Sequence, residues 1–396
     1  MGTVSKVKHI VISGYYGFGN SGDEALLHSI LLALKQEAQK HEMTIVPVVL
    51  SVKPKATELM HGVKAIHRTN LFQIINCIRK SDGLISGGGS LLQDMTGRTT
   101  IPYYLGIIKL AQWLGKPTFI YSQGIGPVFR DLFHPLIRNA FNKSQYVSVR
   151  DAESVKILQG IGVQADRIEI VSDPVMGLPL KPAGRDSGVG GHAGGYTAQD
   201  IGGPVAPAAA RPADSVSVIG ISVRFWNRHR TDLDQLTAAL RLIMKQQTVH
   251  LRFLPFHPPA DLEASEYVIN RLGPDYRDRV SLVADAGDPQ DMLNQVSACD
   301  LIIGMRLHSL IYAAVYAIPM IGISYDPKID HFLNSIEMKA AASTEQLDPQ
   351  SIANEASALL KDRTGWVLSK QHLIDQIKQK SQHAAQQICQ YLRNKG

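Results

Sequence analysis

Residues 299–331, CDLIIGMRLHSLIYAAVYAIPMIGISYDPKIDH, contain two short apolar runs on either side of one apolar helix. The first run, 301–303, ends at Gly304, and the second run covers 320–324. Continuous apolar runs of this length, bounded by turn residues, are typical of strands buried in a parallel sheet. The segment 310–317 is predicted as a helix that ends before Pro319. The stretch therefore predicts a strand–helix–strand unit of a parallel α/β fold.

Polar side chains directly follow both of these predicted strands. Arg306, His308 and Ser309 come after the first strand, and Asp326 and Lys328 come after the second. The carboxyl ends of neighbouring parallel strands lie at one edge of a sheet, where such folds bind ligands. Arginine and lysine near a helix N-terminus suit a small anion with several charges. We therefore expect an anion site at this edge; the alternative is that Arg306 pairs with a carboxylate and His308 is a packed structural residue.

The same pattern of strand, polar turn and helix recurs along the chain. Strands are predicted at 9–13, 44–52, 83–86, 118–122, 146–149, 168–171, 218–223, 250–254 and 281–283. Helical patterns alternate with most of these strands, which predicts two doubly wound parallel sheets. Between the two sheets, the segment 181–215 is dominated by Gly, Ala and Pro and has no apolar periodicity. We predict a flexible linker or loop there.

These boundaries predict two domains in a chain of 396 residues, a length that suits two substantial cores. Residues 1–180 are expected to form an N-terminal Rossmann-like domain, and residues 216–370 a C-terminal one. Residues 371–396 are expected to form a C-terminal helix that packs back across both domains. The composition, 44% hydrophobic and 19% charged, is typical of a globular enzyme.

The net charge limits the classes of binding partner, and the cysteine content indicates the cellular compartment. The net charge of +6 is spread without long runs of like charge, so nucleic-acid binding is not indicated, whereas acidic substrates or an anionic membrane surface would suit it. Cys77, Cys299 and Cys389 form no CxxC motif and are predicted to be reduced thiols, as in the cytosol. Because no apolar run is long enough to span a bilayer, we expect a soluble cytoplasmic protein, at most peripheral at the inner face of the membrane.

Glycine-rich turns follow the predicted strands of the first half. Backbone amides in such turns can approach a ligand closely. We expect the turns at 14–24, 87–90 and 123–127 to contact a ligand, and Arg150 follows another strand of the same sheet. Asp23 and Glu24 suit the first turn of the following helix, where they would interact with the helix dipole. An ion pair with Asp151 or Glu153 is the alternative for Arg150.

Three further features of the chain bear on function. Arg224 and His257 also follow predicted strands of the second half, although His257 lies among prolines and suits a turn equally well. The helix predicted at 103–114 is apolar on most faces; we expect it to cover a sheet, with a membrane surface as the alternative. No His, Cys, Asp or Glu cluster has the spacing of metal ligands, so no metal is expected.

Five motifs in order resemble the polysaccharide pyruvyl transferase family. They are GNSGDEALL at 19–27, SGGGSLLQD at 86–94, QGIGP at 123–127, GMRLHS at 304–309 and YDPK at 325–328. Two Rossmann-like domains facing across a cleft also resemble the GT-B arrangement. Within the family, the motifs are most similar to those of bacterial cell-surface-anchoring pyruvyltransferases, which act on secondary cell-wall polymer precursors. The resemblance covers nearly the whole chain except the linker.

This resemblance implies phosphoenolpyruvate as the donor and a sugar with two suitably placed hydroxyls as the acceptor. The implied product is a 4,6-linked pyruvate ketal on N-acetylmannosamine of a lipid-diphosphate-linked disaccharide, in cell-wall biosynthesis and S-layer anchoring, with no cofactor. The donor residues would be Arg224, Arg306, His308, Ser309, Asp326 and Lys328, of which His308, Arg306 and Lys328 would be catalytic. The residues that would face the acceptor are Tyr16, Gly17, Asn20, Gly88, Gly89, Gln123 and Arg150.

Two other classes of protein remain open from the sequence. One is a glycosyltransferase of the same fold that uses a nucleotide sugar, which would need a site for a base and a ribose. The other is a non-catalytic protein that binds anionic glycans. The predicted pocket is richer in cations than the first class requires, and a histidine among the cations is not explained by the second.

Overall fold

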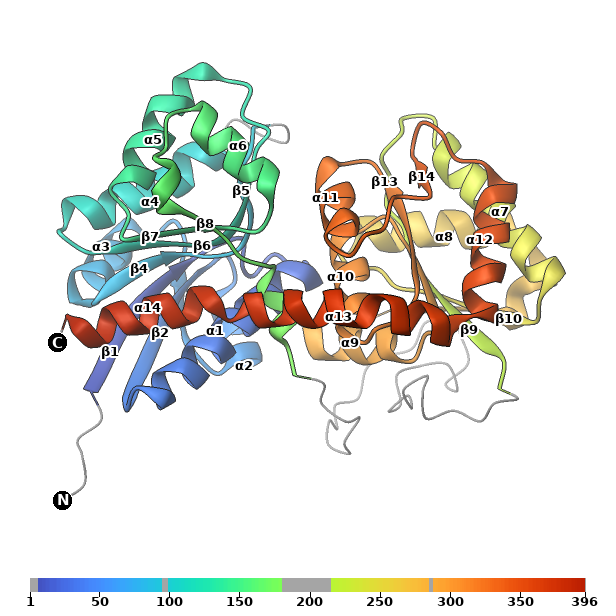
Figure 1. Cartoon of the computed structure of the whole chain (residues 1–396), viewed down its shortest axis with the longest axis horizontal. Helices are drawn as coiled ribbons and strands as arrows, with labels where there is room; N and C mark the ends of the chain where they lie inside the picture. The colour runs from blue at the N-terminus through green and yellow to red at the C-terminus, as the bar shows by residue number, and fades with distance from the viewer. Residues whose placement is uncertain (1–5, 95–98, 180–214, 285–287, 396) are drawn as a thin grey trace. The chain divides into compact units, whose positions relative to one another are not determined.

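The computed structural model describes residues 6–94, 99–179, 215–284 and 288–395, and it divides into two compact units. Unit one combines Met1–Leu178 with Gln376–Gly396, and unit two covers Pro179–Asp375. The linker predicted at 181–215 lies outside the described residues apart from Ser215. The helices and strands of both units are labelled in Figure 1.

Unit one contains a parallel sheet. Its strands are added outward from β1 on one side and outward from β4 on the other, so the strand order reverses between β1 and β4. The strand order is β3-β2-β1-β4-β6-β7-β8, and β5 pairs with β6. The strands are β1 (Lys6–Ser13), β2 (Met43–Ser51), β3 (Lys64–His67), β4 (Gly83–Ser86), β5 (Gly89–Leu92), β6 (Thr118–Ile125), β7 (Tyr146–Val149) and β8 (Ile168–Ile170). Both faces of β4 and β6 are buried, which explains why these strands read as continuous apolar runs.

Helices cover both faces of this sheet (Figure 1). They are α1 (Ser21–Lys40), α2 (Pro54–His61), α3 (Leu71–Lys80), α4 (Thr100–Trp113), α5 (His134–Asn142), α6 (Ala152–Gly160) and α14 (His383–Asn394), with short 3-10 turns η1 (Asp131–Phe133), η2 (Ala165–Arg167) and η3 (Pro174–Gly177). Apolar residues of α3 to α6 share one core, and those of α1 and α14 share a second core. These two cores lie on opposite faces of the sheet.

Unit two contains a second parallel sheet, with the order β11-β10-β9-β12-β13-β14. Its strands are β9 (Ser217–Ser222), β10 (Val249–Phe253), β11 (Val280–Leu282), β12 (Leu301–Gly304), β13 (Met320–Ser324) and β14 (Ala342–Ser343). Its helices are α7 (Thr231–Gln246), α8 (Ala260–Leu272), α9 (Pro289–Ser297), α10 (Leu307–Val315), α11 (Pro327–Ser335) and α12 (Pro349–Lys361), with the 3-10 turn η5 (Pro274–Arg279). Here the chain reverses between β9 and β12.

The prediction of two doubly wound parallel sheets is confirmed, and the differences concern short elements. The short strand β5 was not predicted: residues Gly89–Leu92 pair with β6, and the next helix begins at Thr100. The short strands β3 and β14 were not predicted. Strands of two to four residues form because a neighbouring strand offers hydrogen bonds, a tertiary effect that a local pattern does not carry.

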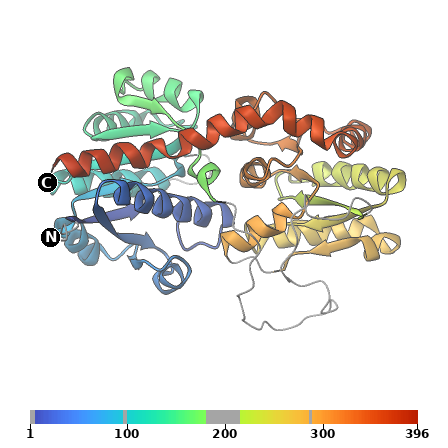
Figure 2. The ribbon, with the colours of Figure 1, turned by 60° about the horizontal axis from the view of Figure 1, so that its bottom comes forward.

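The C-terminal segment forms two helices instead of one. α13 (Arg363–Ser381) begins in unit two and ends in unit one, and α14 follows it after Gln382. α14 packs beside α1, as both views of the ribbon show (Figures 1 and 2). Its buried Ala385 and Ile388 join Leu34 of α1 in the same core. The last turn of the chain is therefore part of the unit that contains the first strand.

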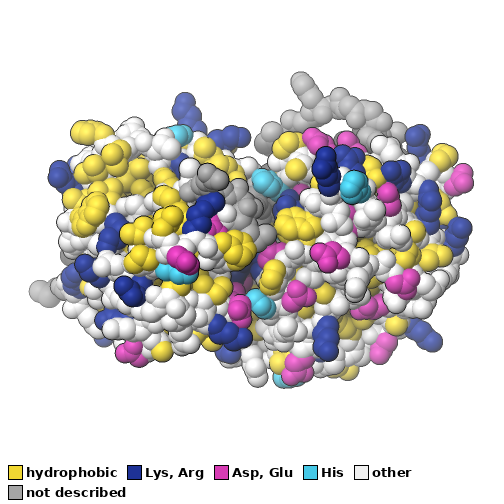
Figure 3. Space-filling view, turned by 90° about the horizontal axis from the view of Figure 1, so that it is seen from above, with side chains coloured by type: hydrophobic (Ala, Val, Ile, Leu, Met, Phe, Trp, Pro, Cys, Tyr) yellow, Lys and Arg dark blue, Asp and Glu magenta, His cyan; other side chains and the backbone are white. Residues whose placement is uncertain are grey.

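The surface of unit one over α4 and α5 carries many hydrophobic side chains together with Lys and Arg (Figure 3). α4 also buries Ile101, Tyr104, Leu105 and Ile108 against the sheet, as expected of a covering helix. Trp113 at its end is 78% exposed. Within the described part of the chain, no helix is long and apolar enough to cross a membrane.

Candidate functional site

Two of the predicted donor residues lie at the switch point of the sheet of unit two, where the order in which the chain adds strands reverses. β9 and β12 are neighbours at that point, and the chain continues from them to Arg224 and Arg306, respectively. In open parallel sheets, ligands bind outside the carboxyl ends of the strands at this position. Both arginines therefore lie where the fold offers a ligand crevice.

Arg306 is held by a buried carboxylate. Its Nε donates to Oδ2 of Asp261 at 2.9 Å, and its Nη2 donates to Oδ1 of the same residue. Asp261 is fully buried in the first turn of α8 and also accepts a hydrogen bond from the backbone amide of His257 at 2.9 Å. Burial alone would lower the pKa of Arg306, but the Asp261 carboxylate raises it. The alternative from the sequence, that Arg306 pairs with a carboxylate, is therefore observed: Arg306 is charged, and Asp261 compensates its charge.

Arg224 has no such compensation. Its Nη1 donates to the Tyr325 hydroxyl at 2.9 Å, and its guanidinium lies 5.2 Å from the ring centre of Trp226 and 4.7 Å from that of Tyr325. Its Nε is buried and has no hydrogen-bond partner among the described residues, where no carboxylate pairs with it either. A partly buried cation with an unused donor is an incomplete site, because an unsatisfied buried donor costs about 1–3 kcal/mol. An anion would complete it.

Lys328 lies beside the same tyrosine. Its Nζ is 5.9 Å from the ring centre of Tyr325 and 2.9 Å from Oδ2 of Asp326. Asp326 also caps α11 by accepting a hydrogen bond from the Lys328 amide at 3.1 Å. Asp326 therefore holds Lys328 near the end of β13. Both side chains are partly exposed, so this pair can open to a ligand at small energetic cost.

The histidines of this region differ in their surroundings. Burial lowers the pKa of His257 below its ordinary value, and the positive charge of Arg306 lowers it further. His257 is therefore neutral at neutral pH. His308 is half-buried in the first turn of α10, two residues after Arg306. Ser309 is fully buried, and its hydroxyl donates to the carbonyl of Arg306 at 2.6 Å, so it fixes the turn between β12 and α10.

In unit one, the crevice between β1 and β4 is filled by the chain itself. Tyr16 lies there with a side chain that is 0% exposed. A Cβ added at Gly14 would lie 2.3 Å from Cζ of Tyr16, and one added at Gly87 would lie 2.3 Å from its hydroxyl oxygen. These two glycines make room for the tyrosine ring. The Tyr16 side chain is thus a core residue and presents no surface to an acceptor in this structure.

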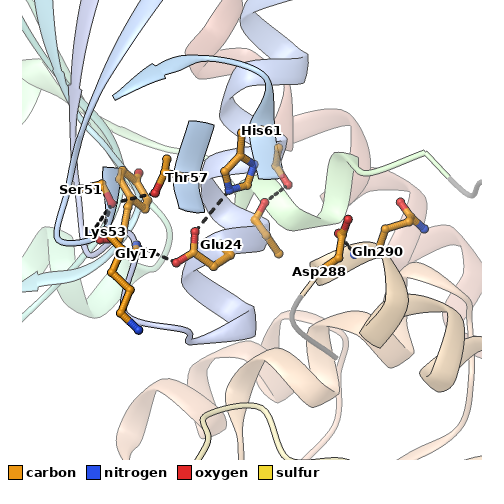
Figure 4. Close-up of polar contacts among 11 residues, drawn as sticks. Gly17, Glu24, Ser51, Lys53, Thr57, His61, Asp288 and Gln290 are labelled. Carbon is orange, nitrogen blue, oxygen red and sulfur yellow. Dashed lines mark hydrogen bonds and ion pairs between the residues drawn. The ribbon is translucent and has the colours of Figure 1, made fainter. Parts of the chain in front are cut away.

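The loop after β1 is tied to a buried pair of ionisable residues (Figure 4). Glu24 accepts a hydrogen bond from the Gly17 amide at 2.8 Å, and its other oxygen lies 3.3 Å from Nε2 of His61. Gly17 has a φ of +82°, and a Cβ there would lie 2.2 Å from Oγ of Ser51. Only glycine suits this position. The carboxylate of Glu24 therefore fixes the loop, in addition to its favourable place in the first turn of α1.

Arg150 forms a buried ion pair with a residue that the sequence did not suggest. Its Nη1 donates to Oδ2 of Asp173 at 2.9 Å, and its Nη2 donates to Oγ of Ser90 at 3.0 Å. The predicted alternatives are wrong, because Asp151 caps α6 and Glu153 pairs with Lys156. The Arg150 side chain is 7% exposed. Its two hydrogen bonds connect the end of β7 with the start of β5 and with the segment that follows β8.

The remaining residues predicted for the acceptor also have contacts within the chain. Asn20 caps α1 through the Gly22 amide at 3.1 Å, and Gln123 is fully buried and donates to Oγ of Ser86 at 2.7 Å. Gly88 and Gly89 are buried beside Leu26 and Asp23 of α1. Their contact with an acceptor stays a prediction.

Sequence reasoning did not find four residues that shape these two regions: Asp261, Tyr325, Trp226 and Asp173. Asp261 was visible as an acidic residue at a helix start, and Trp226 follows Arg224 by two positions. Which cation each one contacts depends on long-range pairing between strand ends. In unit two the result is one compensated arginine, one uncompensated arginine and one lysine around Tyr325, an arrangement that can bind a small anion with two charged groups.

Comparison with a family model gives a match over most of the chain. The model described as polysaccharide pyruvyl transferase matches residues 20–327, which include all the predicted donor residues except Lys328. A comparison with curated proteins gives no match.

Several solved structures share the fold at low sequence identity. A putative UDP-N-acetylglucosamine 2-epimerase from Listeria monocytogenes aligns with a TM-score of 0.61 at 12% identity, over 97% of this chain and 95% of that one. HepE from Anabaena, solved in complex with UDP, aligns with a TM-score of 0.61 at 14% identity, over 97% and 99% of the two chains. UDP-GlcNAc 2-epimerase from Neisseria meningitidis, bound to UDP-GlcNAc, aligns with a TM-score of 0.60 at 12% identity, over 97% and 99%. The chain therefore has the GT-B-like fold of these proteins.

Proposed function

The chain belongs to the polysaccharide pyruvyl transferase family, and from that premise we propose that it transfers the enolpyruvyl group of phosphoenolpyruvate to a sugar as a cyclic ketal. Phosphate is the second product. As proposed, phosphoenolpyruvate is a co-substrate, and the reaction uses no metal or other cofactor.

The observation that carries this proposal is the uncompensated charge of Arg224. Its Nε is a buried donor without a partner among the described residues, at the carboxyl end of the strand where parallel sheets bind ligands. The carboxylate and the phosphate ester oxygen of phosphoenolpyruvate are both attached to its central carbon. We assign one of these groups to Arg224 and the other to Lys328, which can leave Asp326 to bind it.

The chemistry needs two hydroxyls and one positioned proton donor. Protonation of the methylene carbon of phosphoenolpyruvate makes the central carbon electrophilic, and the first sugar hydroxyl adds to it and loses its proton. The second hydroxyl then forms the second C–O bond while the C–O bond to phosphate breaks, and its proton leaves with the phosphate. We assign one of these proton transfers to His308, whose ordinary pKa lies near neutral pH and which lies two residues from Arg306.

The identity of the acceptor sugar is a more specific proposal, and it rests on the motif resemblance. We propose N-acetylmannosamine of a lipid-diphosphate-linked disaccharide, ketalated at its 4- and 6-hydroxyls. The product would belong to cell-wall polysaccharide biosynthesis and would serve S-layer anchoring. We place this reaction at the cytoplasmic face of the membrane, where lipid-linked precursors are accessible.

A nucleotide-sugar glycosyltransferase is the second candidate, because several proteins of the same fold were solved with UDP or a UDP-sugar. Titration calorimetry with phosphoenolpyruvate and with UDP-N-acetylglucosamine separates the two. We expect the wild type to bind only phosphoenolpyruvate.

The variant that tests the site is Arg224→Met, with Arg230→Met as the matched control. Arg230 is also an arginine stacked on aromatic rings, those of Phe225 and Tyr267, but it lies outside the cluster around Tyr325. Loss of a charged hydrogen bond is worth about 1.5–3 kcal/mol, so Arg224→Met should weaken phosphoenolpyruvate binding by roughly 10- to 150-fold. Binding of the sugar nucleotide alone, or equal loss in both variants, would refute the donor assignment.

A further inference from the structure

Unit one exposes four large apolar side chains on the surface that α4, η1 and α5 form. They are Trp113, Phe129, Leu132 and Leu136, with exposed fractions of 78%, 71%, 61% and 50%. We call this surface the α4–α5 face. Single exposed apolar residues are normal on proteins, but a group that includes a tryptophan and a phenylalanine marks an interaction surface.

These four residues are held in place by well-defined contacts. α4 and α5 are adjacent, because Gln112 donates to the carbonyl of Ala140 at 2.8 Å. The loop that carries Phe129 is fixed by Asp94, a residue only 7% exposed, whose carboxylate accepts hydrogen bonds from the amides of Phe129 at 2.9 Å and Arg130 at 3.0 Å. A buried carboxylate thus stabilises a loop that points a phenylalanine into solvent.

The segment that carries these apolar residues has more basic than acidic residues. Between residues 99 and 145 the basic residues are Lys109, Lys116, Arg130, Arg138 and Lys143, and the only acidic residue is Asp131. Lys109 lies one helical turn before Trp113, and partial burial together with the positive charge of Lys143 lowers its pKa. In the described parts of the chain, none of the five basic residues is within ion-pair distance of a carboxylate. The face therefore combines apolar side chains with a positive potential.

We propose that the α4–α5 face binds the surface of an anionic lipid bilayer. Tryptophan, phenylalanine and leucine beside Lys and Arg are the combination that inserts at a bilayer interface and is attracted by anionic headgroups. A second copy of this chain is disfavoured as the occupant, because a symmetric contact would bring the same cations against each other. The lipid-linked acceptor proposed above would be presented at the same surface, although bilayer binding does not depend on the transfer reaction.

The direct test is flotation of the full chain with vesicles, without substrates. Vesicles of phosphatidylcholine alone are compared with vesicles that contain about 30% phosphatidylglycerol, a typical anionic lipid. We expect the chain to bind only the anionic vesicles, and this binding should weaken as the salt concentration is raised. The double variant Phe129→Ser with Leu132→Ser should lower the partition coefficient at least about tenfold, and Lys109→Gln with Lys143→Gln should lower it roughly fivefold for each charge removed.

Matched controls use exposed residues on the opposite face of the sheet. Leu59→Ser combined with Lys55→Gln removes an apolar group that is 90% exposed and an exposed cation on α2, and it should bind like the wild type. Thermal melting checks that each variant is folded. Fluorescence of the wild type should shift to shorter wavelength on vesicle binding, and Trp113→Phe should remove that shift.

Three results would overturn the proposal. The first is absence of wild-type binding to anionic vesicles. The second is equal binding by the Phe129→Ser, Leu132→Ser variant and the Leu59→Ser, Lys55→Gln control. The third is a dimer, detected by light scattering, that the Phe129→Ser and Leu132→Ser changes dissociate while vesicle binding is unaffected. None of these results bears on the calorimetric test of the donor site, so the two proposals fail independently.

Discussion

The guanidinium of Arg224 donates to the hydroxyl of Tyr325 at 2.9 Å, although the two residues are 101 positions apart in the sequence. Arg224 follows β9 and Tyr325 follows β13, and β12 lies between these strands. The hydrogen bond therefore connects segments on either side of the end of β12, which Arg306 follows. Tyr325 contacts both the uncompensated cation and, through its ring, Lys328. Its hydroxyl orients a cation that lacks a carboxylate partner among the residues that the structure describes.

Removing that hydroxyl tests whether Tyr325 positions Arg224. In Tyr325→Phe the ring stays but Nη1 of Arg224 loses its acceptor. We expect phosphoenolpyruvate to bind about 3- to 10-fold more weakly, a smaller effect than that of Arg224→Met, because the lost bond orients the cation and does not contact the ligand. Calorimetry measures the dissociation constant. An effect as large as that of Arg224→Met would instead mean that the hydroxyl contacts the ligand itself.

Arg306 should contribute more to stability than Arg224 does. Arg306→Ala leaves the fully buried carboxylate of Asp261 without its partner, and breaking one side of a buried pair costs about 3–5 kcal/mol. Urea unfolding monitored by circular dichroism measures this loss. The double variant Arg306→Met with Asp261→Leu removes both charges and should regain most of the stability; if it regains none, the pair is not what stabilises this region.

His308 should affect turnover more than binding. As the proposed proton donor or acceptor it acts on the reacting atoms, and such groups contribute about 100- to 10,000-fold to a rate. We expect His308→Ala to lower kcat by this factor while phosphoenolpyruvate still binds. The measurement is phosphate release in the presence of an acceptor, with calorimetry on the same protein. Near-normal turnover would remove His308 from the mechanism.

The two parallel sheets were predictable because their central strands are buried on both faces. Runs such as 301–303 and 320–324 must be continuously apolar to lie inside a sheet covered by helices, and this pattern is local in the sequence. The polar residues after these strands follow from the same pattern. The position of Arg224 and Arg306 at neighbouring strand ends was therefore within reach of sequence reasoning.

The partners of the charged residues were not predictable in the same way. Asp261 reaches Arg306 from α8, and Asp173 reaches Arg150 from η3, and each pair depends on how distant segments meet in space. The glycine turn after β1 was read as a ligand loop, whereas Gly14 accommodates the ring of Tyr16. A glycine that makes room for a ligand and one that makes room for a side chain have the same sequence signature.

The protonation of His257 should make stability depend on pH. Burial and the charge of Arg306 lower its pKa in the folded chain, so the unfolded chain, with a histidine pKa of about 6.5, binds the proton more tightly. Above about pH 6.5, His257 is neutral in both states and does not lower the free energy of unfolding. As the pH falls below that value, the unfolded chain binds the proton first and the free energy of unfolding decreases. His257→Gln should flatten this decrease in urea unfolding measured between about pH 7.5 and about pH 5. Parallel curves for the two proteins would contradict the assignment.

Tyr16 provides the sharpest test of how the crevice of unit one is used. Its hydroxyl is buried and has no hydrogen-bond partner among the described residues. Because an unsatisfied buried hydroxyl is unfavourable, Tyr16→Phe should leave the free energy of unfolding unchanged or raise it by up to about 1–3 kcal/mol. Affinity for the acceptor separates the two roles: a tyrosine that binds the acceptor would lose affinity in this variant, whereas a core tyrosine would not.

Gly87 gives the matched experiment, because a methyl group there would lie 2.3 Å from the Tyr16 hydroxyl oxygen. Gly87→Ala should therefore destabilise the wild type by about 1–3 kcal/mol, the usual range for overpacking. The same change in a Tyr16→Phe background should be milder, since the atom in closest conflict is gone. A double-mutant cycle from urea unfolding measures the coupling between the two sites. A coupling energy of zero would mean that Gly87 does not make room for the tyrosine, and the glycine turn after β4 would then be better explained by a ligand.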